Sequence, residues 1–138
     1  MKVAVIDGLG GGLGAQIVEK LNNKLSNKID ILALGTNAVA TSKMLEQGAD
    51  EGATGENAIK LNVNKVDLII GPLGLIIPNS MKGEITTVMA EAIAGSDAKK
   101  IILGMRQPHV DLVGLSDKTL NELIDDSIKK TEEFLKGK

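Results

Sequence analysis

The chain has 138 residues, 43% of them hydrophobic and 25% charged, which is typical of one globular domain, so we expect residues 1–138 to form a single domain. The formal net charge of −2 gives no electrostatic basis for nucleic-acid binding, and the absence of cysteine excludes disulfides, thiolate nucleophiles and cysteine-ligated metals. No apolar run is long enough to cross a membrane and no signal peptide precedes the first expected strand, so we expect a cytoplasmic protein without a membrane partner.

The first part of the chain reads as a strand, a glycine turn and a helix. An apolar run over residues 2–7 is followed by the glycine-rich segment 8–14, and helical periodicity then continues to about Lys24. Glycine permits positive φ and lets a pyrophosphate approach the backbone, while the helix that follows offers free N–H groups to the anion. The segment therefore predicts a phosphate or carboxylate site, and the alternative is a turn made of glycine only for close strand–helix packing.

Two spacings of the turn point to dinucleotide binding. Gly10-x-Gly12-x-x-Ala15 matches the glycine fingerprint of dinucleotide-binding folds. Gly8-x-x-x-Gly12-x-Gly14 resembles the opening of the short-chain dehydrogenases. The catalysis of that family is excluded here, because it uses a tyrosine and the chain has none.

The second strand is expected over residues 29–34, and a helix over 38–47. A dinucleotide site with NAD places an acid near the end of this strand to hold the ribose, and a site with NADP places an arginine nearby. This chain has Gly35, Thr36 and Asn37 there, and neither an acid nor an arginine. Thr36 or Asn37 could bond a ribose, and Asn37 could equally be the N-cap of the next helix.

The middle of the chain predicts a short third strand over residues 49–53, a helix over 58–64 capped by Thr54, and a buried strand over 66–71. Glu56 and Asn57 are either capping residues or ligand contacts. The apolar loop 72–83 follows, and it must pack on the sheet edge, on a ligand or on another subunit.

The last part predicts a helix over residues 84–94 and a fifth strand over 100–104. Residues 110–114 alternate and could be an edge strand or an extended crossing, and the final helix opens at 116–119. Between the fifth strand and residues 110–114 lie Arg106, either an anion clamp or a surface ion pair, and His109. His109 is the only histidine, and its role is either acid–base chemistry or packing at the surface.

Strands that alternate with helices predict an α/β fold: a three-layer, Rossmann-like, doubly wound parallel sheet of about five strands, in the probable order 3-2-1-4-5. The glycine turn would then lie at the switch point of the sheet, where such folds bind ligands. The residues expected to contact the ligand at that edge are Asp7, Gly8, Gly10, Gly11, Gly12, Leu13, Gly14, Thr36, Asn37, Gly71, Pro72, Asn79, Ser80 and Arg106. Glu84 is expected at the same edge.

Asp7 complicates this site, because a carboxylate beside an anion would repel it. We expect Asp7 to bond a ribose or a loop amide, or to position a cation. One histidine and scattered acids predict no protein metal site, and any Mg²⁺ would arrive with a nucleotide.

Three segments together resemble an uncharacterised family of short bacterial proteins, a domain of unknown function that is Rossmann-like. They are residues 6–14, residues 33–37 with 48–57, and residues 71–86. The resemblance implies the fold and no activity.

We therefore expect a protein that binds a small anionic ligand, which is a nucleotide, a dinucleotide such as NAD(P), or another phosphate-bearing molecule such as a sugar phosphate. The alternative is a non-catalytic sensor or assembly module that acts through homo-oligomerisation. With either function we expect a homo-oligomer, namely a homodimer whose subunits share the loops of residues 73–77 and whose contact includes Ile76. The reaction, if there is one, is not assigned.

Overall fold

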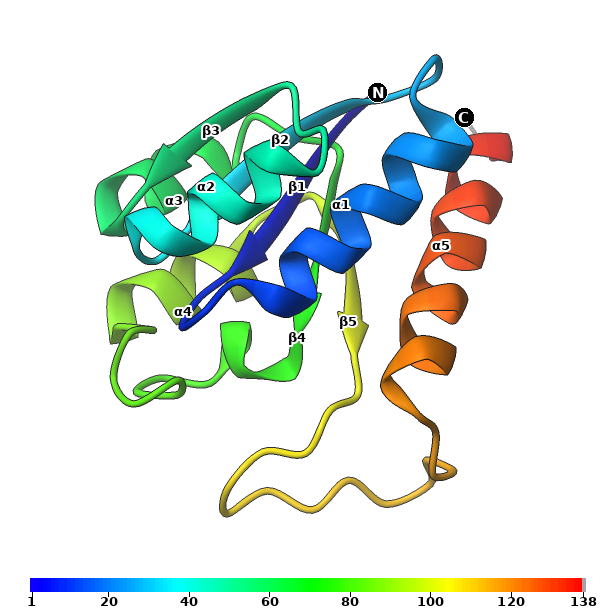
Figure 1. The fold of residues 1–138 in the computed structure, drawn as a ribbon. Coiled ribbons are helices and arrows are strands. Elements are labelled where there is room, and N and C mark those ends of the chain that lie inside the picture. The colour runs from blue at the N-terminus through cyan, green and yellow to red at the C-terminus, as the bar shows by residue number, and fades with distance from the viewer. Residues whose placement is uncertain (138) are drawn as a thin grey trace.

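The computed structural model describes residues 1–137, and Lys138, the last residue of the expected domain, lies outside the described residues. Five parallel strands form one sheet in the order β3-β2-β1-β4-β5 (Figure 1). The strands are β1 (Lys2–Asp7), β2 (Asp30–Gly35), β3 (Glu51–Thr54), β4 (Leu68–Pro72) and β5 (Lys99–Leu103). The predicted number, direction and order of the strands are confirmed.

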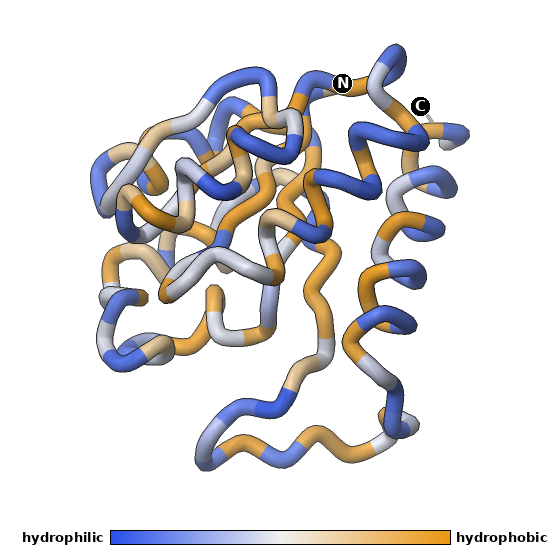
Figure 2. The backbone as a smooth tube through the Cα atoms, in the orientation of Figure 1, coloured by the Kyte–Doolittle hydropathy of each residue, from blue (hydrophilic) through white to orange (hydrophobic). Residues whose placement is uncertain are grey.

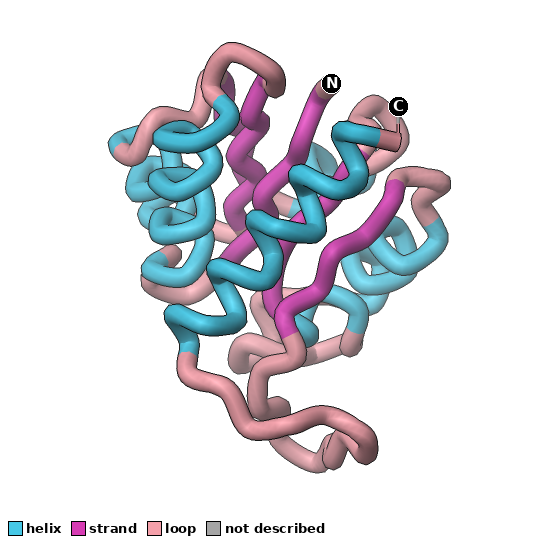
Figure 3. The backbone as a smooth tube through the Cα atoms, turned by 90° about the vertical axis from the view of Figure 1, so that its right-hand side faces the viewer, coloured by secondary structure: helices cyan, strands magenta, loops and turns pink. Residues whose placement is uncertain are grey.

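Helices cover both faces of the sheet (Figure 3). They are α1 (Gly12–Leu25), α2 (Ala38–Glu46), α3 (Glu56–Asn62), α4 (Thr87–Gly95) and α5 (Leu120–Lys136), with a short 3₁₀ helix η1 (Leu73–Ile76) directly after β4. Each strand ends at the same edge of the sheet before the chain crosses back through a helix. This is the Rossmann-like α/β arrangement that the alternation of elements predicts.

The central strands are buried on both faces because their apolar side chains alternate between two cores. Val3 and Val5 point to the core under α1 and α5, and Ala4 and Ile6 point to the core under α3 and α4. All four are fully buried. Figure 2 shows the apolar strands enclosed by helices whose outer residues are polar.

The helices α4 and α3 begin at places other than those predicted. The predicted helix over 84–94 begins at Thr87, because Thr86 adopts an extended backbone and its Oγ1 accepts from the Met89 N–H at 3.1 Å. Glu84 is thereby left in the turn before α4. The helix α3 begins at Glu56 with Gly55 as its N-cap, whereas the hydroxyl of Thr54 bonds that of Thr41 at 2.7 Å. The predicted cap by Thr54 is therefore wrong.

Asn37 is the N-cap of α2, as one of the two interpretations of this residue requires. Its Oδ1 accepts from the Ala40 N–H at 2.9 Å. The final helix begins later than predicted, at Leu120, since Thr119 and Glu122 form a capping box.

Residues 104–119 form a long segment, here called the arm, that leaves the carboxyl edge of the sheet and returns to α5 (Figure 1). Its only ladder contact among the described residues is an isolated antiparallel bridge between Gln107 and Val110. Residues 110–114 are therefore not an edge strand, and residues 113–114 form a turn in which Gly114 has φ of +93°.

Candidate functional site

The turn between β1 and α1 lies at the carboxyl edge of the sheet, at the point where the order of strands reverses. β1 pairs with β2 on one side and with β4 on the other, so consecutive crossovers leave this point in opposite directions. Ligands of doubly wound folds bind at such a point. The predicted position of the glycine turn is confirmed.

Three glycines of the turn are required by packing inside the protein. A Cβ on Gly8 would lie 2.7 Å from the Met81 Sδ, and a Cβ on Gly14 would lie 2.7 Å from the Met44 Sδ. Gly11 has φ of +74°, and a Cβ there would lie 2.6 Å from the Cα of Ala40. For these positions the packing interpretation accounts for the residue type.

Gly10 and Gly12 differ from them. A Cβ at either position would meet nothing within 4 Å, and neither residue has positive φ. Both are exposed. Within residues 1–137 the backbone N–H groups of Gly10, Gly12 and Leu13 donate to no acceptor, so three donors face outward at the start of α1.

Asp7 is an internal part of the turn. Its side chain is buried, Oδ1 accepts from the Gly8 N–H at 2.8 Å, and Oδ2 accepts from the Gly14 N–H at 2.7 Å. Burial raises the pKa of this carboxyl above its ordinary value, against the opposing effect of the two backbone hydrogen bonds. Of the roles considered for Asp7, the bond to loop amides is the one that the structure contains.

Glu84 reaches the turn from the segment before α4. Its Oε1 accepts from the Leu9 N–H at 2.9 Å, from the Thr36 hydroxyl at 2.5 Å and from the Asn37 amide at 2.9 Å. These hydrogen bonds, the one from Thr36 first, lower the pKa of Glu84. Thr36 and Asn37 are therefore brought to the glycine turn, as predicted, and a carboxylate joins them.

Glu84 is expected from the sequence at this edge, but it is not among the residues predicted to contact the ligand. The acid missing after β2 is supplied from 48 residues further along the chain. No local signal could have revealed this, because Glu84 also suits the first turn of the helix predicted there.

Other predicted site residues serve the structure. Gly71 and Pro72 are buried at the end of β4, and a Cβ on Gly71 would lie 2.6 Å from the carbonyl oxygen of Ile6. Ser80 is buried and donates to the carbonyl of Gly74. Asn79 is exposed, with φ of +66°.

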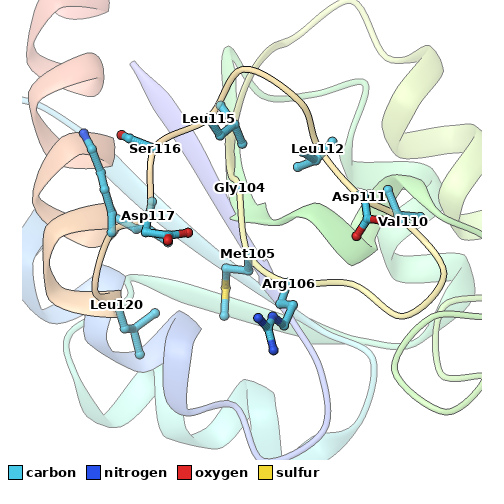
Figure 4. Close-up of a pocket in the computed structure, with 12 residues that line it drawn as sticks. Gly104, Met105, Arg106, Val110, Asp111, Leu112, Leu115, Ser116, Asp117 and Leu120 are labelled. Atoms are coloured by element: carbon cyan, nitrogen blue, oxygen red, sulfur yellow. The ribbon is translucent and has the colours of Figure 1, made fainter.

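Arg106 lies on the arm. It lines a cavity of about 420 Å³ between the arm, the end of β5 and the start of α5 (Figure 4). None of the residues of the glycine turn lines this cavity. His109 is exposed on the arm with φ of +64°.

Glu56 and Asn57 are exposed at the start of α3. Glu56 lies in the first turn of α3, where a negative charge interacts favourably with the helix dipole.

Neither a metal cluster nor a membrane span is found in the part of the chain that the structure describes. No three His, Asp or Glu side chains there are grouped to hold a metal ion. None of the helices within residues 1–137 is long and apolar enough to cross a membrane.

The fold and the turn define this chain as a Rossmann-like α/β protein with a glycine turn at the switch point. A profile of the family described as a domain of unknown function (DUF3842) matches residues 2–136. The chain belongs to this family, which agrees with the resemblance found in its sequence. Among curated proteins, none matches the chain.

Two solved structures are similar to this chain. One is the dodecameric FMN-dependent UbiX-like decarboxylase from Escherichia coli O157:H7, with a TM-score of 0.47 and 12% identity over 96% of this chain and 77% of that one. The other is the D-arabinose dehydrogenase from Sulfolobus solfataricus, with a TM-score of 0.46 and 14% identity over 97% of this chain and 43% of that one.

Proposed function

We propose that this protein binds a nucleotide, a dinucleotide such as NAD(P), or another phosphate-bearing ligand at the glycine turn, with the phosphate on the N–H groups of Gly10, Gly12 and Leu13. The observation that carries the proposal is the contrast among the glycines. Packing requires Gly8, Gly11 and Gly14, but nothing within the described residues requires glycine at 10 or 12. An approaching ligand supplies a reason for both.

The chemistry of these donors suits an anion. Three N–H groups without acceptors lie at the positive end of the α1 dipole. The charge of Asp7 counts against a phosphate, but both of its oxygens already accept hydrogen bonds from Gly8 and Gly14. The remaining donors of the turn are free to hold a ligand from outside.

The residues present fit the phosphate part of a nucleotide cofactor and leave its base less constrained. The only aromatic residue, Phe134, lies on α5, so the base would be held by aliphatic side chains.

A thermal-shift screen with NAD, NADP, ATP, FMN and inorganic phosphate tests the proposal. A ligand present at about 100 times its Kd adds about 2.7 kcal/mol of stability, which raises Tm by several degrees. Gly12→Val should abolish the shift without unfolding the protein, because its Cβ enters the space that the phosphate needs.

The matched control is Gly95→Val, at a second exposed glycine whose Cβ would also meet nothing within 4 Å. It should keep the shift. No shift with any of these ligands, or an unchanged shift in Gly12→Val, would remove the phosphate site.

A second candidate function is assembly through homo-oligomerisation, and the arm is the observation that favours it. Leu112, Val113 and Leu115 are 43%, 98% and 60% exposed. Ile76, the residue expected at a dimer contact, is half-buried and lines an apolar cavity of about 490 Å³ together with Leu112 and Leu115. A monomeric mass by light scattering at micromolar concentration would contradict this candidate.

A further inference from the structure

We propose that Glu84 binds the vicinal hydroxyls of a phosphorylated ribose whose phosphate lies on the glycine turn, and that it excludes a 2′-phosphate. This inference rests on the proposed function and adds the class of ligand. It starts from the position of one carboxylate, which residues of two other segments of the chain hold in place.

The carboxylate of Glu84 is fixed through one of its two oxygens. The donors to Oε1 come from Leu9 in the glycine turn and from Thr36 and Asn37 after β2. Asn37 also donates to the carbonyl of Leu9 at 2.9 Å, which ties the two loops together. A carboxylate held in this way needs no rearrangement to receive a ligand.

The second oxygen of Glu84 is free. Among the described residues no donor reaches Oε2, and no buried side-chain oxygen there lacks a partner, so Oε2 is open to solvent. The hydrogen bonds on Oε1 lower the pKa of the group, so at neutral pH it is ionised and can only accept hydrogen bonds. The ligand that fits it must carry donors.

The glycine turn permits this approach. A Cβ on Gly8 would lie 2.6 Å from the Thr36 Oγ1 and 3.1 Å from the Glu84 Oε1. Glycine at this position therefore leaves room for the Glu84 carboxylate and the Thr36 hydroxyl to lie against the turn. The unpaired N–H group of Gly10 follows directly after Leu9, whose N–H Glu84 accepts.

The site thus combines two opposite requirements within a few residues. The N–H groups of Gly10, Gly12 and Leu13 are free to bond an acceptor, and Oε2 of Glu84 is free to accept from a donor. A ribose phosphate carries both, as phosphate oxygens and as vicinal hydroxyls, and a carboxylate is the group that holds ribose hydroxyls in dinucleotide sites. A second phosphate at the 2′ position would meet a fixed negative charge and lose the donor.

Titrations of the wild-type protein test the inference without any variant. The probes are ADP, 2′-deoxy-ADP and ADP that carries an added 2′-phosphate, with ribose 5-phosphate to distinguish a free sugar phosphate from a nucleotide. We expect ADP to bind at least about tenfold more tightly than 2′-deoxy-ADP and than the 2′-phosphorylated probe, as the loss of a charge-assisted hydrogen bond implies. Binding of ribose 5-phosphate as tight as that of ADP would assign the site to a sugar phosphate.

The variant Glu84→Gln then tests the role of Oε2 separately from that of Oε1. The amide oxygen keeps the three hydrogen bonds that Oε1 accepts, while an NH₂ group replaces Oε2. We expect the affinity for ADP to fall at least about tenfold and the discrimination against the 2′-phosphate to shrink. The control is Glu91→Gln, which removes one negative charge from an exposed position on α4.

The outcomes separate this inference from the proposed function. If ADP binds but 2′-deoxy-ADP and the 2′-phosphorylated probe bind as tightly as ADP, Glu84 does not bind the ribose hydroxyls, and the phosphate site stands. If neither ADP nor ribose 5-phosphate binds the wild-type protein, the role of Glu84 is overturned, and the thermal-shift screen with inorganic phosphate and the other ligands decides whether the phosphate site stands.

Discussion

The glycine turn and the arm both leave the carboxyl edge of the sheet, and they are held in opposite ways. In the turn, Asp7 and Glu84 accept N–H groups of Gly8, Leu9 and Gly14, and the residues around three of its glycines leave no room for a Cβ. In the arm, one isolated bridge is the only ladder contact among the described residues, and Val113 is 98% exposed. The difference shows that two carboxylates, one buried and one half-buried, can fix a segment that has almost no side chains of its own.

The arm, in contrast to the turn, is a long segment with apolar side chains that few contacts hold in place. A connection of this length without regular structure is uncommon in a domain unless it has a function, and an apolar tip in water is unfavourable. Figure 2 shows apolar residues along the arm, although the arm has the rest of the protein on one side only. The turn is therefore the segment that we propose as a ligand site, and the arm is the one that we propose as a contact between subunits.

The largest effect that we expect comes from breaking the turn at a packing glycine. Gly11→Val combines a positive φ with a Cβ placed 2.6 Å from the Cα of Ala40, and neither can relax without moving α2. We expect a loss of about 3 kcal/mol or more in the free energy of unfolding, measured by denaturant titration. The adjacent variant Gly12→Val should change it by less than about 0.5 kcal/mol. Equal losses of unfolding free energy in the two variants would show that packing does not distinguish Gly11 from Gly12.

An intermediate effect on the free energy of unfolding is expected from pH, because folding lowers the pKa of Glu84 and raises that of Asp7. The lowered pKa of Glu84 gives stability that is present above its ordinary value of 4.5 and is lost as the pH falls through the folded value. The raised pKa of Asp7 has the opposite sign, since the folded state holds that proton more tightly, and its contribution falls as the pH rises above 3.8.

The two contributions can be separated with Glu84→Gln. The difference in unfolding free energy between the wild type and this variant should be greatest near neutral pH and should shrink below about pH 4. Denaturant titrations at several pH values would measure it. A difference that stays constant across this range would mean that the charge of Glu84 does not stabilise the turn.

The smallest effect on folding is expected in the arm. Val113→Asp should change the unfolding free energy by less than about 0.5 kcal/mol, because the side chain is 98% exposed. If the arm mediates assembly, the same variant should dissociate the oligomer in light scattering, whereas Leu61→Asp, at a 52% exposed position on α3, should not. An oligomer that survives Val113→Asp would place the contact elsewhere.

Local pattern was enough to predict most of the fold. The apolar runs of β1 and β4, the helical periodicity between them and the glycines at their ends predict alternating elements, and right-handed crossovers then leave few possible strand orders. Boundaries were less certain where a cap decides them. The hydroxyl of Thr86 starts α4 after Glu84, although the acid could equally have begun the helix.

The candidate site was predicted only in part. Its place at the edge and the nearness of Thr36 and Asn37 to the turn follow from the order of the strands. The roles of Gly71 and Ser80 in packing do not, because a buried glycine or serine at a strand end looks the same in sequence as one that contacts a ligand.

The sequence by itself determined that the chain is a parallel α/β protein and where its glycine turn lies, since periodicity and turn chemistry are local properties. Only the tertiary structure decided which glycines are enclosed, that Asp7 points inward, and that Glu84 stands beside β2 in place of the acid missing there. These are contacts between segments far apart in the chain, with Glu84 lying 48 residues from Thr36. No local pattern encodes them, because they exist only once the sheet has brought its carboxyl ends together.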